Sequence, residues 1–226
     1  MNEQHPDDFQ ELKTFTGETV WYNPVTHVYT TVDGVKLVSG SEYAESMSAP
    51  FDVEMLSGRV ARKYGVTVEN VRAMWEMNGL ISRTFGNALH YSMEQWFRHR
   101  DCGTAKEYHL PKPLYLREAV LSFPHKGAVI LPEVVVSDVA GGRVGRVDAL
   151  HFIKGLHENV VEIVDFKSDN DVKKNLEKHQ HQLNFYRVIL EAKGISVPRM
   201  VIWNYVKEWT EHEVSKIAVK ESTDGK

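Results

Sequence analysis

Three side chains, Asp148, Asp165 and Lys167, have the types and spacing of a catalytic metal centre. In the β-prone run 159–168, Asp165 and Lys167 alternate with apolar residues, so they point to the same strand face as Val161 and Ile163. A carboxylate on a buried face is costly unless an ion or a partner compensates its charge. A divalent cation is one such compensation, and an ammonium beside it can orient water or offset charge on a phosphate.

The same alternation predicts two more carboxylates on faces that otherwise look buried. Asp148 lies in the run 143–153, and Glu133 lies in the run 129–137. Three neighbouring strands would then each carry one acid, and Mg²⁺ or Mn²⁺ prefers such hard oxygen ligands. A structural Asp–Lys ion pair is the alternative, and a D-x-K pattern alone favours that alternative. The apolar residues on these faces are Leu150 and Phe152 beside Asp148, and Val129, Leu131 and Val135 beside Glu133.

Two further groups of polar residues recur at helical spacing. Gly86, His90 and Glu94 are four residues apart and line one side of a predicted helix. His90 can offer a neutral nitrogen to a metal, whereas a satisfied structural histidine is the alternative. Gln182 and Tyr186 are also four apart, and a glutamine among apolar residues needs a partner for its amide. That partner is either the catalytic region or a neighbouring strand.

The elements that must position these residues form an α/β pattern. The runs 129–137, 143–153 and 159–168 are joined by short turn-like links, which predicts an antiparallel three-strand meander within a central mixed sheet. Helices are expected to flank this sheet, one of them over 172–193, and a further strand over 199–206. The N-terminal half is expected to be helical after a β-hairpin over 19–37, whose turn is Asp33-Gly34.

Length and composition limit the classes of protein that fit. The 226 residues predict one domain, divided into an N-terminal hairpin and helices (1–80), a core (81–206) and a C-terminal extension (207–226). The single cysteine, Cys102, excludes an internal disulfide and an all-cysteine metal site. No signal peptide or membrane-spanning run is evident, so a cytoplasmic location without membrane contact is expected.

The formal net charge of −4 argues against bulk electrostatic binding of nucleic acid. Any contact with phosphates must therefore come from a local basic surface. Solvated helix faces are the favoured explanation for each basic cluster taken alone. These clusters are Arg59 with Arg62 and Lys63, then Arg98-His99-Arg100, and Lys173-Lys174 with Lys178.

The order of the motifs resembles the RecB-like branch of the PD-(D/E)xK nuclease superfamily. Gly145-x-x-Asp148 and the strand Asp165-Phe166-Lys167-Ser168 are similar to its G-x-x-D and D-[YF]-K-[TS] strands. The helix from Gly86 through His90 to Glu94 is similar to its G-x-x-x-H-x-x-x-E motif. The pair Gln182-x-x-x-Tyr186 is similar to its Q-x-x-x-Y motif. These motifs cover residues 86–186, and a looser likeness reaches Ser39-Gly40-Ser41.

The resemblance implies a restriction-endonuclease-like core and metal-dependent hydrolysis of phosphodiester bonds in DNA. It implies Mg²⁺ or Mn²⁺ as the cofactor, with Lys167 acting on the attacking water or the transition state. Glu133 and Glu94 would bind the metal through water or hold a second ion, and Glu94 would otherwise hold His90 or make a polar contact. The implied primary ligands are His90, Asp148, Asp165 and the backbone carbonyl of Phe166, and the implied contacts to substrate come from Gln182 and Tyr186.

A single-domain exonuclease of the phage or mitochondrial type, acting on single-stranded or duplex DNA ends, is the expected function. The chain has no helicase motif and one cysteine, so it departs from the helicase-associated members and from those with a four-cysteine iron–sulfur cluster. A recombination or replication protein is a further expected partner. Three alternatives stay open: a structure-specific endonuclease, a nucleic-acid-binding or complex-forming protein that keeps the fold without turnover, and an unrelated α/β protein. The residues leave the oligomeric state undetermined.

Overall fold

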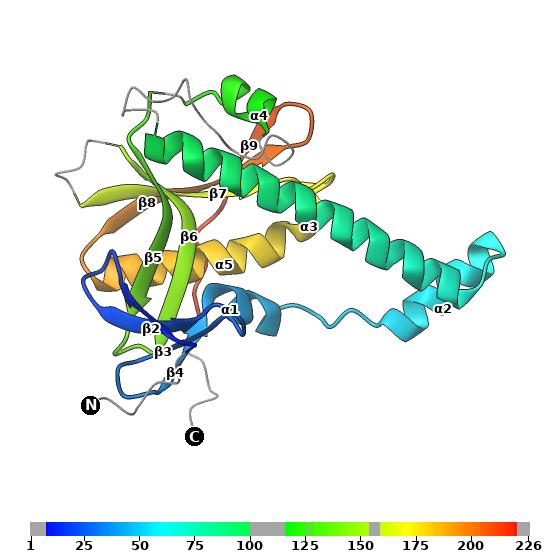
Figure 1. Ribbon diagram of the computed structural model, residues 1–226, viewed down its shortest axis with the longest axis horizontal. Coiled ribbons are helices and arrows are strands. Elements are labelled where there is room, and N and C mark those ends of the chain that lie inside the picture. Colours follow the sequence, from blue (N-terminus) through cyan, green and yellow to red (C-terminus); the bar gives the residue numbers. More distant parts are fainter. Residues whose placement is uncertain (1–7, 100–115, 126, 154–158, 221–226) are drawn as a thin grey trace.

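The computed structural model describes residues 8–99, 116–125, 127–153 and 159–220. Within them, a large and mostly antiparallel sheet is flanked by helices (Figure 1). The strand order is β1-β2-β3-β4-β6-β7-β8-β9, and β5 also pairs with β6. The strands are β1 (Gln10–Lys13), β2 (Thr19–Asn23), β3 (Val28–Thr30), β4 (Lys36–Ser39), β5 (Ile130–Asp138), β6 (Arg143–Phe152), β7 (Val160–Lys167), β8 (Ser196–Tyr205) and β9 (Trp209–Glu213).

The predicted meander is confirmed. Strands β5 and β6 pair antiparallel along almost their whole length, from Ile130 opposite His151 to Asp138 opposite Arg143. Strand β7 pairs antiparallel with the far end of β6, and β8 then runs parallel to β7. The central sheet is therefore mixed, and β6, which carries Asp148, lies in its middle.

Alternating side chains along these strands form a core on each face of the sheet. One core joins Val161 and Ile163 of β7 to Leu183 and Ile189 of helix α5 (Val172–Ala192). The other joins Phe166 of β7 to helix α3 (Val68–His99) and to the short helix α4 (Arg117–Ser122). Because successive residues of a strand point to opposite faces, Asp165 and Lys167 lie on the α5 side.

The first strands attach a small antiparallel sheet to the central one. Asp33-Gly34 forms the predicted turn between β3 and β4, and Gly34 has a positive φ of 79°. Strand β4 then runs parallel to the start of β6 and continues into helix α1 (Gly40–Ser46). Ser39 caps this helix in a reciprocal capping box with Glu42. This connection places residues 39–41 beside the start of β6.

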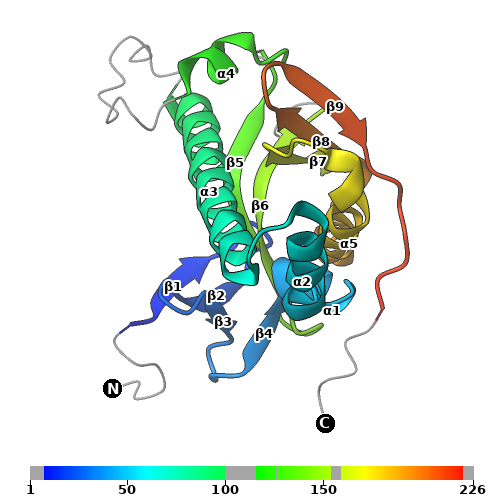
Figure 2. The same ribbon diagram turned by 90° about the vertical axis from the view of Figure 1, so that its right-hand side faces the viewer.

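Helix α2 (Val53–Tyr64) and the N-terminal half of α3 form a helical hairpin that extends away from the sheet (Figures 1 and 2). We call residues 53–85 the arm. Gly65, in the left-handed region at φ 66°, ends α2 and turns the chain back. Because α3 is continuous over 32 residues, it runs without a break from the arm to the sheet.

Other boundaries differ from those predicted. The first half of the chain is less helical than expected, since residues 10–39 carry four strands before the first helix. The C-terminal extension contributes a strand to the central sheet, because β9 pairs with β8. None of the described helices is long and apolar enough to span a membrane. Cys102 and Arg100 lie outside the described residues.

Asn184 fastens the segment after β9 to helix α5. Its side chain is fully buried, and its amide donates to the carbonyls of Gln180 and Ser215. The Asn184 carbonyl oxygen accepts from the backbone N–H of Ile217 and from Arg187. A buried amide with all these partners holds residues 215–217 against the helix.

Asn184→Ala should therefore lower the free energy of unfolding by roughly 1–3 kcal/mol, since it leaves buried donors and acceptors without partners. Urea unfolding would measure the loss, and limited proteolysis should show earlier cleavage after residue 213. Gln180→Ala is the control, because that side chain gives only one bond to the same segment. Equal effects of the two substitutions would contradict the assigned role.

Candidate metal centre

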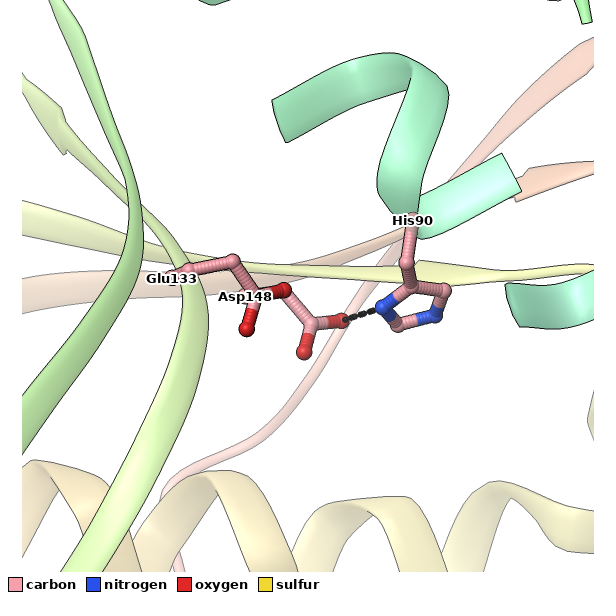
Figure 3. Close-up of side chains that lie close together, drawn as sticks. All are labelled: His90, Glu133 and Asp148. Carbon is pink, nitrogen blue, oxygen red and sulfur yellow. Dashed lines mark ion pairs between the residues drawn. The ribbon is translucent and has the colours of Figure 1, made fainter. Parts of the chain in front are cut away.

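His90, Glu133 and Asp148 converge on one point beside the central sheet (Figure 3). Each offers one donor atom, and these atoms all lie within 4.8 Å of one another. Within this group, His90 Nδ1 lies 3.5 Å from Asp148 Oδ2. Two carboxylate oxygens and one imidazole nitrogen suit Mg²⁺ or Mn²⁺, and a small inward shift would bring all three to coordination distance.

Strands β5 and β6 position the two acids opposite each other. Pro132 pairs with Ala149 and Val134 with Val147, so Glu133 and Asp148 fall between these pairs. Glu133 has a positive φ of 51°, which is uncommon for any residue other than glycine. This strained backbone turns the Glu133 side chain toward Asp148, and such strain is concentrated at functional sites.

The surroundings of Glu133 differ from those predicted. Val129 and Leu131, which were expected to share a buried face with it, are 41% and 40% exposed. The alternation of β5 is interrupted at Glu133, because a residue with positive φ no longer continues the regular pleat. A one-residue irregularity of this kind leaves no clear periodic signal, so the sequence pattern missed it.

Burial and neighbouring negative charge make the ionised form of Glu133 unfavourable. Burial, followed by the negative charge of Asp148, raises the pKa of Glu133 to about 7. The positive charge of Arg146 acts in the opposite direction, and one of its nitrogens lies 3.9 Å from Glu133 Oε2. A carboxyl with so high a pKa lacks sufficient positive charge nearby, which a bound divalent cation would supply.

Asp165 and Lys167 form a buried ion pair next to this group. Lys167 Nζ lies 2.7 Å from Asp165 Oδ2, and the Asp165 side chain is 5% exposed. Burial raises the pKa of Asp165 above its usual range, against the lowering effect of Lys167. Burial alone would lower the pKa of Lys167, but the carboxylates of Asp165 and Asp148 outweigh it and the pKa rises. Lys167 is therefore an ammonium held beside the acids.

The predicted ligands are thus only partly brought together. His90, Asp148 and Glu133 form the group, whereas Asp165 is bound to Lys167 and lies outside it. The backbone of Phe166 is close, because its N–H donates to Asp148 Oδ2 at 2.8 Å. Lys167 Nζ lies 3.5 Å from the Phe166 carbonyl oxygen.

Helix α3 carries His90 and borders a pocket of about 450 Å³, which His90 and Glu133 of this group help to line. Gly86, one turn earlier, faces Ser168 just after β7, and an added Cβ would lie at an ordinary contact distance of 3.4 Å from Ser168 Oγ. Glu94, one turn later, accepts from Arg98 at 2.8 Å rather than holding His90. The pocket is lined by Arg83, Gly86, Asn87, His90, Tyr91, Glu94, Glu133, Lys167, Ser168 and Asp169.

Gln182 and Tyr186 of α5 approach the centre from the opposite side of β6. Gln182 Nε2 donates to the Tyr186 hydroxyl oxygen at 3.0 Å, and Tyr186 is 4% exposed. A Cβ at Gly40 or at Gly145 would overlap the Tyr186 ring. The two glycines therefore let the ring lie between α1 and β6.

Other residues at the centre carried no signal in the sequence. Arg146, an unassigned position of the Gly145-x-x-Asp148 motif, contacts Glu133. Asn204 of β8 makes a reciprocal pair of bonds with the backbone of Asp169, and His179 Nε2 lies 3.1 Å from Asp169 Oδ2. These bonds fix the turn that follows Lys167. The sequence alone does not reveal these bonds, because they join β8, α5 and the turn after β7.

Comparisons with known proteins leave the chain without an assigned family. No protein-family model matches it, and no curated protein matches it. Among solved structures, one described as "Crystal structure of SSO0001" is similar at 14% identity and a TM-score of 0.32. The match covers 80% of this chain and 67% of that one. A likeness this loose carries no argument about function.

Gly145→Ala should destabilise the protein by about 1–3 kcal/mol, because the new methyl group would overlap the Tyr186 ring. The double variant Gly145→Ala with Tyr186→Ala should be less destabilised than the sum of the single variants, since the overlap is gone. Urea unfolding measures both. Gly58→Ala on α2 is the matched control, as its Cβ meets only the tip of Arg62 at 3.9 Å. Additive effects, or a Gly145→Ala variant as stable as Gly58→Ala, would refute the packing argument.

Proposed function

We propose that this protein is a metal-dependent DNA nuclease with a restriction-endonuclease-like core, belonging to the RecB-like branch of the PD-(D/E)xK superfamily. The observation that carries the proposal is the group of His90, Glu133 and Asp148 with the buried Asp165–Lys167 pair beside it. An acid-and-imidazole group next to a fixed ammonium is suited to a phosphodiester substrate, whose charge increases during hydrolysis.

The residues present fit a divalent cation. His90, Asp148 and Glu133 would hold it, and burial together with the charge of Asp148 raises the pKa of Glu133, so a cation there would be stabilised by both acids. A bound Mg²⁺ or Mn²⁺ would supply Lewis acidity and a water activated at neutral pH. No side-chain nucleophile, and hence no covalent intermediate, is then required.

Each protein group has a task in this scheme. Lys167, kept cationic by Asp165 and Asp148, would donate hydrogen bonds to the attacking water or to a phosphate oxygen. The Phe166 N–H orients the Asp148 carboxylate. Arg83 lines the pocket in front of the centre and is the exposed cation there that would meet the substrate backbone. Asp165 would neutralise Lys167 rather than bind the ion directly.

We propose that the protein acts as an exonuclease on free single-stranded or duplex DNA ends. The activity would serve recombination, repair or phage DNA metabolism. It would act in the cytoplasm, with a recombination or replication protein as a further partner. The alternatives are a structure-specific endonuclease and a silent protein that binds nucleic acid. The silent protein is disfavoured because Lys167 and the three converging donors are all retained.

Mn²⁺ should bind this centre and raise the melting temperature. At a hundredfold excess over Kd, binding adds about 2.7 kcal/mol, or roughly 5–10 °C for a chain of this size. Differential scanning fluorimetry with EDTA-treated protein measures the shift. Asp148→Asn and His90→Ala should each remove most of it, whereas the exposed Glu76→Gln on the arm should keep it. A full shift in Asp148→Asn would show that the ion binds elsewhere.

With Mg²⁺ or Mn²⁺, the protein should degrade end-labelled linear DNA and spare circular DNA, and EDTA should abolish the reaction. Lys167→Ala should slow cleavage by about 10²–10³-fold, the usual effect of removing one donor to the developing charge. Lys216→Ala, an exposed lysine paired with Glu191, should cleave like wild type. Cleavage of circles would replace the exonuclease with an endonuclease. The enzyme proposal fails if no metal-dependent cleavage sensitive to Lys167→Ala is found.

A further inference from the structure

An apolar stripe runs along one side of α3 within the arm. Met74, Met77, Leu80 and Ile81 form it, and each of these residues is more than half exposed. At 100° per residue they cover about 120° of the helix circumference. A stripe of this width normally packs against a core, so its exposure marks a surface that another molecule covers. We call these four residues the α3 stripe.

The α3 stripe is accessible to an approaching chain. The arm extends away from the sheet (Figures 1 and 2). Val71 and Trp75, on the α2 side of the hairpin, lie about 120° and 160° around α3 from Met77. His90, at the candidate metal centre, lies about 140° around the helix from Met77. A molecule on the stripe therefore disturbs neither the packing of α2 nor the pocket beside His90.

The spacing of the stripe is that of a seam between two helices. Met74, Met77 and Ile81 follow one another at intervals of three and four residues, and Leu80 lies three residues after Met77. Apolar residues at these intervals let two helices pack side by side at a shallow angle. The stripe thus fits another helix that carries a similar stripe. A second copy of the chain supplies one, because a two-fold dimer joins the same surface of both copies.

The charges beside the stripe favour a second copy in the antiparallel orientation. Glu76 and Arg83 are exposed and border the Leu80 edge, and no ion pair among the described residues uses either of them. They are seven residues apart, so they lie on nearly the same side of α3, the acid nearer the tip of the arm and the base nearer the sheet. Antiparallel packing brings each Glu76 to Arg83 of the other copy, whereas parallel packing opposes like charges.

We propose that the α3 stripe is the contact surface of a two-fold symmetric dimer, in which the α3 helices of two copies pack antiparallel. Met77 of one copy lies against Ile81 of the other, and the same alignment pairs Glu76 with Arg83. The contact covers about three turns of one helix, which is a small interface, so the dimer forms and dissociates with concentration. This inference does not depend on the proposed nuclease function.

Sedimentation velocity of the full chain tests the dimer over concentrations of about 1–300 µM, the range suited to a small interface. The weight-average mass should rise toward twice that of one chain. Met77→Glu places a charge within the stripe and should weaken association by about tenfold or more. Met55→Glu is the matched control and should leave association unchanged, because Met55 is 62% exposed, against 63% for Met77, but lies on α2.

Charge reversal tests the antiparallel orientation. Glu76→Arg should weaken association by placing like charges together, and the double variant Glu76→Arg with Arg83→Glu should restore it. The dimer is refuted by a chain that stays monomeric, which would leave the stripe to a different partner, or by a dimer that Met77→Glu leaves intact. A double variant as weak as Glu76→Arg alone would refute the antiparallel pairing.

Two controls keep this result separate from other effects. Circular dichroism of each variant distinguishes lost association from lost folding. Met77→Glu should keep the Mn²⁺-induced rise in melting temperature, because Met77 lies on a different side of α3 from His90. A failed dimer with an intact Mn²⁺ shift would therefore refute the dimer alone, and a dimer without metal-dependent cleavage would refute the nuclease alone.

Discussion

Negative charge concentrated on three adjacent strands is the constraint on which the rest of this structure depends. Asp148 lies opposite Glu133 across one strand pair and close to Asp165 across the other. The protein compensates this charge only in part: Lys167 neutralises Asp165, and the Phe166 N–H and His90 face Asp148. Glu133 is left with an elevated pKa and a strained backbone. Such an arrangement costs folding free energy, and groups with strained backbone or perturbed pKa values are concentrated at functional sites.

Close packing around β6 is what allows the groups on both sides of the sheet to reach this charge. Gly145 and Gly40 leave room for the Tyr186 ring, which brings α5 against the strand that carries Asp148. On the α3 side, a Cβ added at Gly86 would meet only Ser168 Oγ, at an ordinary contact distance of 3.4 Å. The absence of a side chain at Gly145 and Gly40 therefore sets how closely α5 approaches β6, and Gly145 has no positive φ.

Strand and helix periodicity predicted the elements well where one periodic pattern dominates. The meander, the long helix α5 and the strand after it follow from alternation and apolar spacing, and His90 and Asp148 meet as expected. Two features escaped prediction because they depend on tertiary contacts or on single backbone angles. The positive φ of Glu133 redirects that acid, and Arg146 contacts Tyr22 only because the N-terminal strands pack beside β6. The ion pair between Asp165 and Lys167 is the alternative that the D-x-K pattern itself favoured. The C-terminal segment was also unpredictable, since its position depends on the buried amide of Asn184.

Helix α3 joins two surfaces that differ in chemistry. At 100° per residue, Arg83 and His90 fall on one side of the helix, the side that lines the pocket at the metal centre. Met74, Met77 and Ile81 fall on the opposite side of the arm, where they are 51%, 63% and 61% exposed. Val71 and Trp75 lie between these sides and face α2, Val71 buried and Trp75 in edge contact with Phe51. The pocket beside the candidate metal centre therefore lies on the Arg83 side of α3, and the apolar side faces away from it. The continuous helix fixes the relative orientation of these two sides.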